Sequence, residues 1–214
     1  GGLGRYLLAI WKDKHLLHTF AGYVYFWFAG VIMQQTITVL IQQLGGIPDN
    51  ARGTFTSVCL AFTALGIGFG SFVAGIASRR KIELGIVPVG IFGMTFFGLL
   101  LGLQTALSEK ADAGAVVAAG SAFSLPHVLL IVFIFFMGFF AGFFDVPLAA
   151  TVQKRSPSHL RGGIMAAGNM LTFLGMLAGG ALFGLFGLLH LPPSLIFLLI
   201  AGFSLAVGLY MCFE

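Results

Sequence analysis

The feature that most constrains this chain is a set of six long stretches that contain almost no charged residues. Each is about 20 residues or longer, the length that an α-helix needs to cross a membrane. The stretches are continuously apolar, whereas the strands of a membrane barrel alternate polar and apolar residues. The sequence therefore predicts an all-α polytopic membrane protein. We expect a single six-helix unit over residues 1–214, with spans at about 19–41, 54–77, 84–107, 126–151, 162–189 and 194–213.

Composition excludes the other broad classes of protein. Charged residues make up 8% of the 214 residues and hydrophobic residues 58%, whereas about 25% of the residues of a soluble domain are charged. The chain has too little polar surface for a soluble globule and is too apolar to be disordered. The net charge of +4 is spread in small clusters, so no basic face for nucleic acid is expected. The lipid bilayer is the expected environment.

The positions of the cations predict the orientation of the spans. Two cations, Arg52 and Lys110, fall on one side of the predicted membrane. The other nine fall on the opposite side, three in each of three alternate segments: Arg5, Lys12, Lys14, Arg79, Arg80, Lys81, Lys154, Arg155 and Arg161. Because cytoplasmic loops are enriched in Lys and Arg, both ends of the segment are expected in the cytoplasm.

One acidic residue, Asp145, lies inside a predicted span. Ionisable residues within spans are costly, so Asp145 is a functional candidate. We expect a charge latch in which it meets a cation of the basic loop that contains Arg79, Arg80 and Lys81. Two alternatives remain open: Asp145 lies at interface depth and balances local positive charge, or it relays protons.

The first span carries a stripe of polar and aromatic side chains on one narrow arc, at about 100° per residue. Its candidate substrate-lining residues are Tyr23, Trp27, Gln34 and Thr38. Hydrogen bonding between helices is the alternative interpretation. A weaker stripe in the fifth span adds Asn169, where packing is equally plausible. The third and sixth spans are nearly featureless, so we expect them at the lipid-facing periphery.

Motifs for catalysis and metal binding are absent from the sequence. The five histidines lack the His-x4-Asp arrangement of glycerolipid acyltransferases, and no serine hydrolase, metalloprotease or nucleotide-binding motif occurs. No cluster has the spacing of metal ligands. We therefore expect no enzymatic activity, cofactor or metal in this segment.

A six-helix unit with both ends inside resembles one half of a major facilitator superfamily transporter. Several stretches are similar to the C-terminal half of the lysophospholipid transporter family, especially to the version fused to a 2-acylglycerophosphoethanolamine acyltransferase and an acyl-acyl-carrier-protein synthetase. They are YFWFAGVIMQ (25–34), GSFVAG (70–75), KIELGIVPVG (81–90), VPL (146–148), QKRSP (153–157), RGG (161–163), AAGN (166–169) and GML (175–177).

The resemblance implies a flippase that moves lysophosphatidylethanolamine across a bacterial inner membrane by alternating access and feeds phospholipid reacylation. It implies that the first, second, fourth and fifth spans line a cavity. The expected partners are the lysophospholipid, a missing N-terminal six-helix half and fused enzyme domains beyond Glu214. The chain departs from the superfamily loop motif at Arg79, which stands where an acidic residue is usual.

Two other functions remain open at this stage. One is a major facilitator transporter for another small solute. The other is a non-transporting membrane anchor for a fused acyltransferase, which predicts that the polar stripe of the first span tolerates leucine.

Overall fold

The computed structural model describes residues 2–44, 47–78, 84–111 and 125–213, and within them finds seven α-helices and one short 3-10 turn. Six of these helices are long and apolar enough to cross a membrane. They are α2 (Lys14–Gln43), α3 (Asp49–Ala77), α4 (Val87–Ala111), α5 (Leu125–Arg155), α6 (Arg161–Leu188) and α7 (Pro193–Phe213). The expected all-α class with six candidate spans is confirmed, and the chain is a multi-pass membrane protein.

The helix ends show why the observed bounds differ from the predicted ones by a few residues. The carboxylate of Asp13 accepts a hydrogen bond from the Leu16 N–H at 3.2 Å and caps α2 before its apolar part begins. The third span was predicted to begin at residue 84. There the chain forms the short 3-10 turn η1 (Leu84–Ile86), so α4 begins three residues later. Pro193 opens α7, where its missing N–H costs no hydrogen bond.

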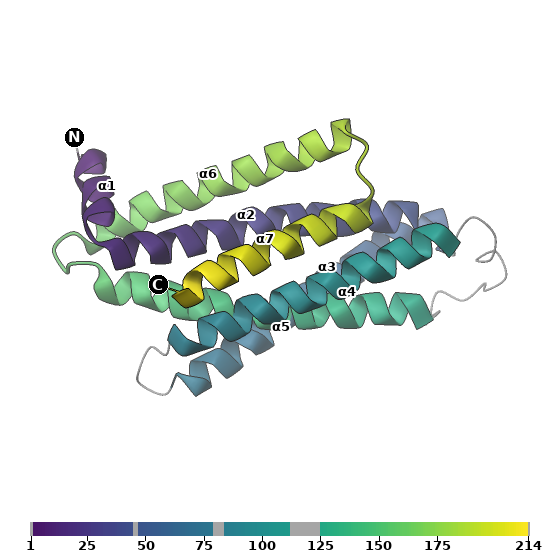
Figure 1. The fold of residues 1–214 in the computed structure, drawn as a ribbon, viewed down its shortest axis with the longest axis horizontal. Helices are drawn as coiled ribbons and strands as arrows, with labels where there is room; N and C mark the ends of the chain where they lie inside the picture. Colours follow the sequence, from purple (N-terminus) through teal and green to yellow (C-terminus); the bar gives the residue numbers. More distant parts are fainter. Residues whose placement is uncertain (1, 45–46, 79–83, 112–124, 214) are drawn as a thin grey trace.

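The contacts between helices repeat between the first three spans and the last three. α3 packs most extensively against α5, and α6 packs against α2 at the edge of the bundle (Figure 1). α4 packs against α5 as α7 does against α2, while α4 pairs with α7 and α2 with α5. Exchanging α2, α3 and α4 for α5, α6 and α7 reproduces this set of contacts. Because three crossings reverse the direction of the chain, the two units are inverted relative to each other.

Glycines set the close approach of α3 and α5. A Cβ added at Gly138 of α5 would lie 2.6 Å from the carbonyl oxygen of Thr63, and one at Gly70 of α3 would collide with the backbone of Phe139. Each helix therefore offers small residues to the other, which brings the two backbones into contact.

The third and sixth spans, α4 and α7, expose large side chains such as Phe96 and Phe203. They also pack against each other, and α3 and α6 are the least buried of the six spans.

A seventh helix, α1 (Gly2–Lys12), was not predicted from the sequence and lies across the end of the bundle (Figure 1). Its Ile10 is buried in a small cluster with residues of α2, α5 and α6, and the ring of Tyr6 covers Gly163, where a Cβ would collide with it. Its outer side exposes Leu8 and Trp11. Isolated helices of eleven residues are marginal in water, so packing against the bundle stabilises α1.

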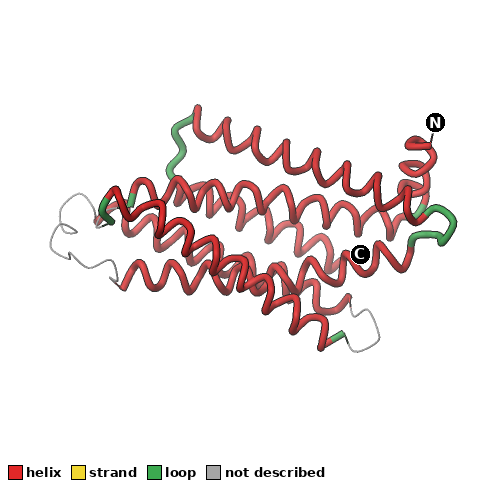
Figure 2. Tube along the Cα trace, turned by 180° about the vertical axis from the view of Figure 1, so that it is seen from behind, coloured by secondary structure: helices red, strands yellow, loops and turns green. Residues whose placement is uncertain are grey.

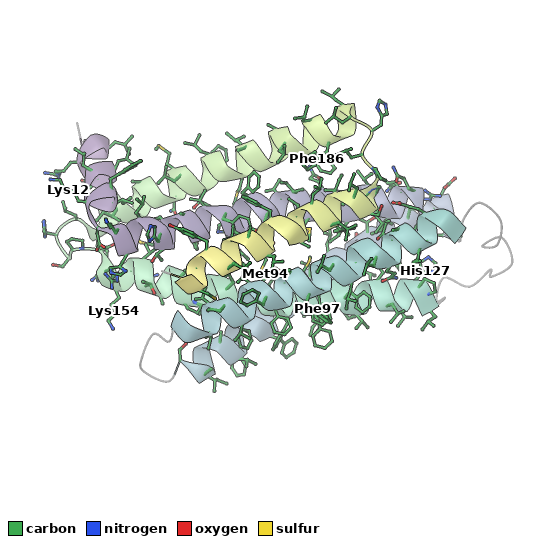
Figure 3. All side chains as sticks on the ribbon, viewed as in Figure 1. Lys12, Met94, Phe97, His127, Lys154 and Phe186 are labelled. Atoms are coloured by element: carbon green, nitrogen blue, oxygen red, sulfur yellow. The ribbon has the colours of Figure 1, made fainter. Side chains whose placement is uncertain are left out.

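The two ends of the bundle differ in charge. α1 and the end of α7 lie at the same end, as seen from both sides (Figures 1 and 2). Lys12 and Lys154 lie at this end and His127 at the opposite one (Figure 3). We call the end with Lys12 and Lys154 the basic end. Arg155 forms an ion pair with Asp13 there, with 3.8 Å between the guanidinium and the carboxylate.

Candidate functional site

A cavity of about 470 Å³ lies among the spans, within the size range of small-molecule sites. It is lined chiefly by α2, α3 and α5, with a residue of α4 and of α6 and two residues of α7. The lining residues are Phe26, Trp27, Ala29, Gly30, Val31, Met33, Gln34, Ile37, Leu60, Thr63, Ala64, Ile67, Met94, Met137, Gly138, Ala141, Asp145, Met176, Ile200 and Ser204. Met94 lies in the middle of the bundle (Figure 3).

Most of the lining is apolar and adaptable. Four methionines line the cavity, one each from α2, α4, α5 and α6. Methionine has an unbranched, flexible side chain that fits irregular shapes. The wall suits a flexible hydrocarbon chain better than a rigid polar ring.

A few polar groups face this apolar wall. The Nε1 atom of Trp27 and the Oδ1 atom of Asp145 are both buried, and neither has a hydrogen-bond partner among the described residues. Gln34 also lines the cavity, and its side chain is exposed. The site therefore offers a donor, a carboxylate and an amide to whatever enters.

Ser204 of α7 is not among the predicted site residues, because the sixth span is nearly featureless in the sequence. Its Oγ lies 2.5 Å from the Tyr25 hydroxyl and donates to the Ile200 carbonyl at 2.8 Å. Since Ser204 also lines the cavity, this hydrogen bond joins α2 and α7 directly behind the cavity wall. Two serines ten residues apart in an apolar helix give no periodic signal, so only the tertiary contact reveals the role of Ser204.

The predicted substrate-lining residues are partly brought together. Trp27 and Gln34 line the cavity, which extends along α2 from residue 26 to residue 37. Tyr23 and Thr38 share their arc but lie just beyond its two ends; Tyr23 packs against the core, and the Thr38 hydroxyl donates to the Gln34 carbonyl at 3.0 Å. Asn169 is exposed on α6, two turns nearer the basic end than Met176. Their contact with a substrate stays a prediction.

Of the residues in the predicted charge latch, only Asp145 belongs to the described part of the chain. Asp145 lines the cavity, whereas Arg79, Arg80 and Lys81 lie outside the described residues. Among the described residues Asp145 forms no ion pair. The latch stays a prediction.

Candidate metal ligands do not cluster in the described part of the chain, where no group of three or more His, Cys, Asp or Glu side chains could hold an ion. The two cysteines are free: Cys59 is buried and Cys212 is exposed. The cavity with its polar groups is therefore the candidate site for binding.

Comparison with known proteins gives one kind of match. No family model matches the chain, and no solved structure matches it significantly. Curated proteins named lysophospholipid transporter LplT are similar to it. The protein from Yersinia enterocolitica is 28% identical over 156 residues, 73% of this chain and 33% of its own length. That from Cronobacter sakazakii is 28% identical over 184 residues, 86% of this chain and 40% of its own length.

The similarity to a third relative has the same extent. The lysophospholipid transporter LplT of Yersinia pestis strain Pestoides F is 27% identical over 154 residues, which cover 72% of this chain and 32% of the relative. The matches thus span about a third to two-fifths of the length of these curated relatives.

Proposed function

We propose that this chain is the C-terminal half of a lysophospholipid transporter that carries lysophosphatidylethanolamine. The observation that carries the proposal is the cavity, whose wall combines methionine and phenylalanine with an indole N–H, an amide and a carboxylate. A lysophospholipid has one acyl chain and one polar head, so both kinds of surface find a counterpart. The relatives named as lysophospholipid transporters support the same class of cargo.

Transport in this proposal proceeds by alternating access. An N-terminal six-helix half closes the cavity from the face that α3 and α6 leave exposed, and the two halves rock against each other. Trp27 and Gln34 contact the head of the cargo, with Tyr23, Thr38 and Asn169 beyond the ends of the cavity along its path. The protein lies in a bacterial inner membrane with both ends of the segment in the cytoplasm. The delivered lipid is reacylated there, by enzyme domains fused to the transporter.

Flipping of a labelled lysolipid by the full-length chain tests this function. The chain is reconstituted into vesicles, labelled lysophosphatidylethanolamine is added outside, and albumin extracts what remains in the outer leaflet. We expect the protected fraction to rise faster than in vesicles without protein, and the 214-residue segment alone to give no increase. Equal rates with and without the full-length chain contradict lysolipid transport.

The cavity wall is tested separately with a double variant, Trp27→Ala with Gln34→Ala. Transport should fall at least about tenfold, because both side chains that face the head are lost. Phe96→Ala with Leu103→Ala, on the exposed side of α4, is the matched control and should transport normally. Normal transport by the first double variant contradicts the lining role and favours the membrane-anchor alternative. Inhibition of lysolipid transport by added sugars would favour the alternative in which the chain carries another small solute.

A further inference from the structure

Asp145 stands out because it is the one acidic or basic side chain among the described residues that line the cavity. Its Oδ1 is buried without a hydrogen-bond partner there, and no described cation pairs with it. Trp27 presents a buried and equally unpartnered N–H to the same cavity. Unmatched polar groups are costly at membrane depth, so intramembrane ionisable residues usually mark a substrate or ion pathway.

The two groups lie at similar depth. The ion pair between Asp13 and Arg155 gives α2 and α5 a common reference level at the basic end. Trp27 lies 14 residues along α2 from Asp13 (27 − 13), and Asp145 lies 10 residues along α5 from Arg155 (155 − 145). At 1.5 Å per residue these are about 21 and 15 Å along the two helices. The backbone positions of the two residues are therefore offset by about 6 Å along the bundle, with Asp145 nearer the basic end.

We propose that Asp145 and Trp27 form a head-group site for a zwitterion, in which the Asp145 carboxylate accepts hydrogen bonds from the cargo's ammonium group and the Trp27 Nε1–H donates to its phosphate. The inference rests on the proposed lysophospholipid transport and adds the residues that select the head. A carboxylate and a donor at neighbouring depths match a head in which an ammonium and a phosphate are joined by a short linker.

The charge of Asp145 also predicts which heads the site would favour. A carboxylate repels a purely anionic head, and no described lining residue offers a compensating cation. The four methionines and the phenylalanine of the wall accept the acyl chain and add no charge. The ammonium is thus the part of the cargo that Asp145 can recognise, and selectivity between zwitterionic and anionic lysolipids follows from it.

The test compares lysophosphatidylethanolamine with lysophosphatidylglycerol of the same acyl chain, supplied as a labelled mixture to the full-length chain in vesicles. Both lipids carry the phosphate, but only the first carries an ammonium group. The measured quantity is the transport rate of the ethanolamine lipid divided by that of the glycerol lipid. In Asp145→Asn we expect this ratio to fall about tenfold, the effect of losing one charge-assisted hydrogen bond. Asp49→Asn, an exposed carboxylate at the start of α3, is the matched control and should leave the ratio unchanged.

A second variant separates the two contacts. Trp27→Phe keeps an aromatic ring but removes the N–H, so transport of both lysolipids should fall by a similar factor and the ratio should stay at the wild-type value. A ratio unchanged in Asp145→Asn overturns the ammonium contact. An equal fall for both lipids in that variant also overturns it and favours the charge latch with the basic loop. If the wild-type chain moves neither lipid, the proposed function itself fails.

Discussion

Tyr25 and Ser204 are 179 positions apart in the chain, and their hydroxyl oxygens lie 2.5 Å apart in the structure. Both side chains are buried among apolar neighbours, with the Tyr25 ring edge-on to Phe144 and Phe203. A buried hydroxyl needs a partner, and this pair supplies one within the bundle. At the scale of residues, therefore, this hydrogen bond joins α2 and α7 beside the cavity.

Removing this hydrogen bond should have a modest effect on stability. Tyr25→Phe should lower the free energy of unfolding of the full-length protein by about 0.6–1.5 kcal/mol, the range for one interhelical hydrogen bond. Thermal denaturation in detergent measures it. Tyr23→Phe is the matched control, because the half-buried Tyr23 lies two residues away on α2 and packs against the core. Equal losses in the two variants would show that the hydroxyl of Tyr25 contributes nothing specific.

Between elements, the tightest contact is that of α3 with α5. Gly138 faces the Thr63 carbonyl, Gly142 faces the backbone at Ser71, and Gly66 and Gly70 face the backbone of α5. In both helices these glycines are four residues apart, a spacing that can be read from the sequence, but the sequence does not show which helix each pair faces. Since interhelical packing in a membrane depends on close backbone approach, these glycines hold α3 and α5 together as one unit beside the cavity.

Adding a side chain at this contact should separate the two helices. Gly138→Ala should destabilise the full-length protein by about 1–3 kcal/mol, the usual effect of overpacking, because the new Cβ would lie 2.6 Å from a backbone oxygen. Gly68→Ala on α3 is the control: no atom lies within 4 Å of a Cβ there, and alanine favours the helix. Denaturation midpoints in detergent should fall for the first variant only. A stable Gly138→Ala protein contradicts the packing argument.

For the molecule as a whole, the inverted arrangement of two three-helix units leaves a cavity beside α2 and α5, the first helix of each unit. Both of these helices have neighbours on several sides: α2 contacts α3, α5, α6 and α7, and α5 contacts α2, α3, α4 and α6. This arrangement also places the N- and C-terminal ends of the chain at the same end of the bundle, the basic end (Figures 1 and 2). The distribution of cations predicts that this end lies in the cytoplasm.

Cysteine labelling of the full-length chain tests that orientation. In a background with Cys59→Ala and Cys212→Ala, Asn50→Cys lies at the start of α3 and Ser158→Cys lies between α5 and α6, and both positions are exposed. Because the basic end is expected in the cytoplasm, an impermeant thiol reagent should label Asn50→Cys in intact cells. It should label Ser158→Cys only after the inner membrane is opened. The reverse pattern would contradict the predicted orientation.

The sequence by itself determined that the chain forms apolar helices and roughly where they lie. A helix in lipid satisfies its own backbone hydrogen bonds, so its formation depends on the local length and hydrophobicity of the segment. The helical arc of Trp27 and Gln34 was visible for the same reason, since it lies within one helix. α1 was missed because its short apolar face is stabilised by a cluster from three other helices.

Only the tertiary structure decided which side chains share a cavity and where that cavity stops. Tyr23 and Thr38 lie on the arc of Trp27, but neighbouring helices limit the cavity to residues 26–37 of α2. Asp145 and Ser204 join Trp27 from two other helices that are distant in the chain. Such meetings depend on how helices fit side against side, through small residues and specific contacts, and no periodicity within one helix contains that information.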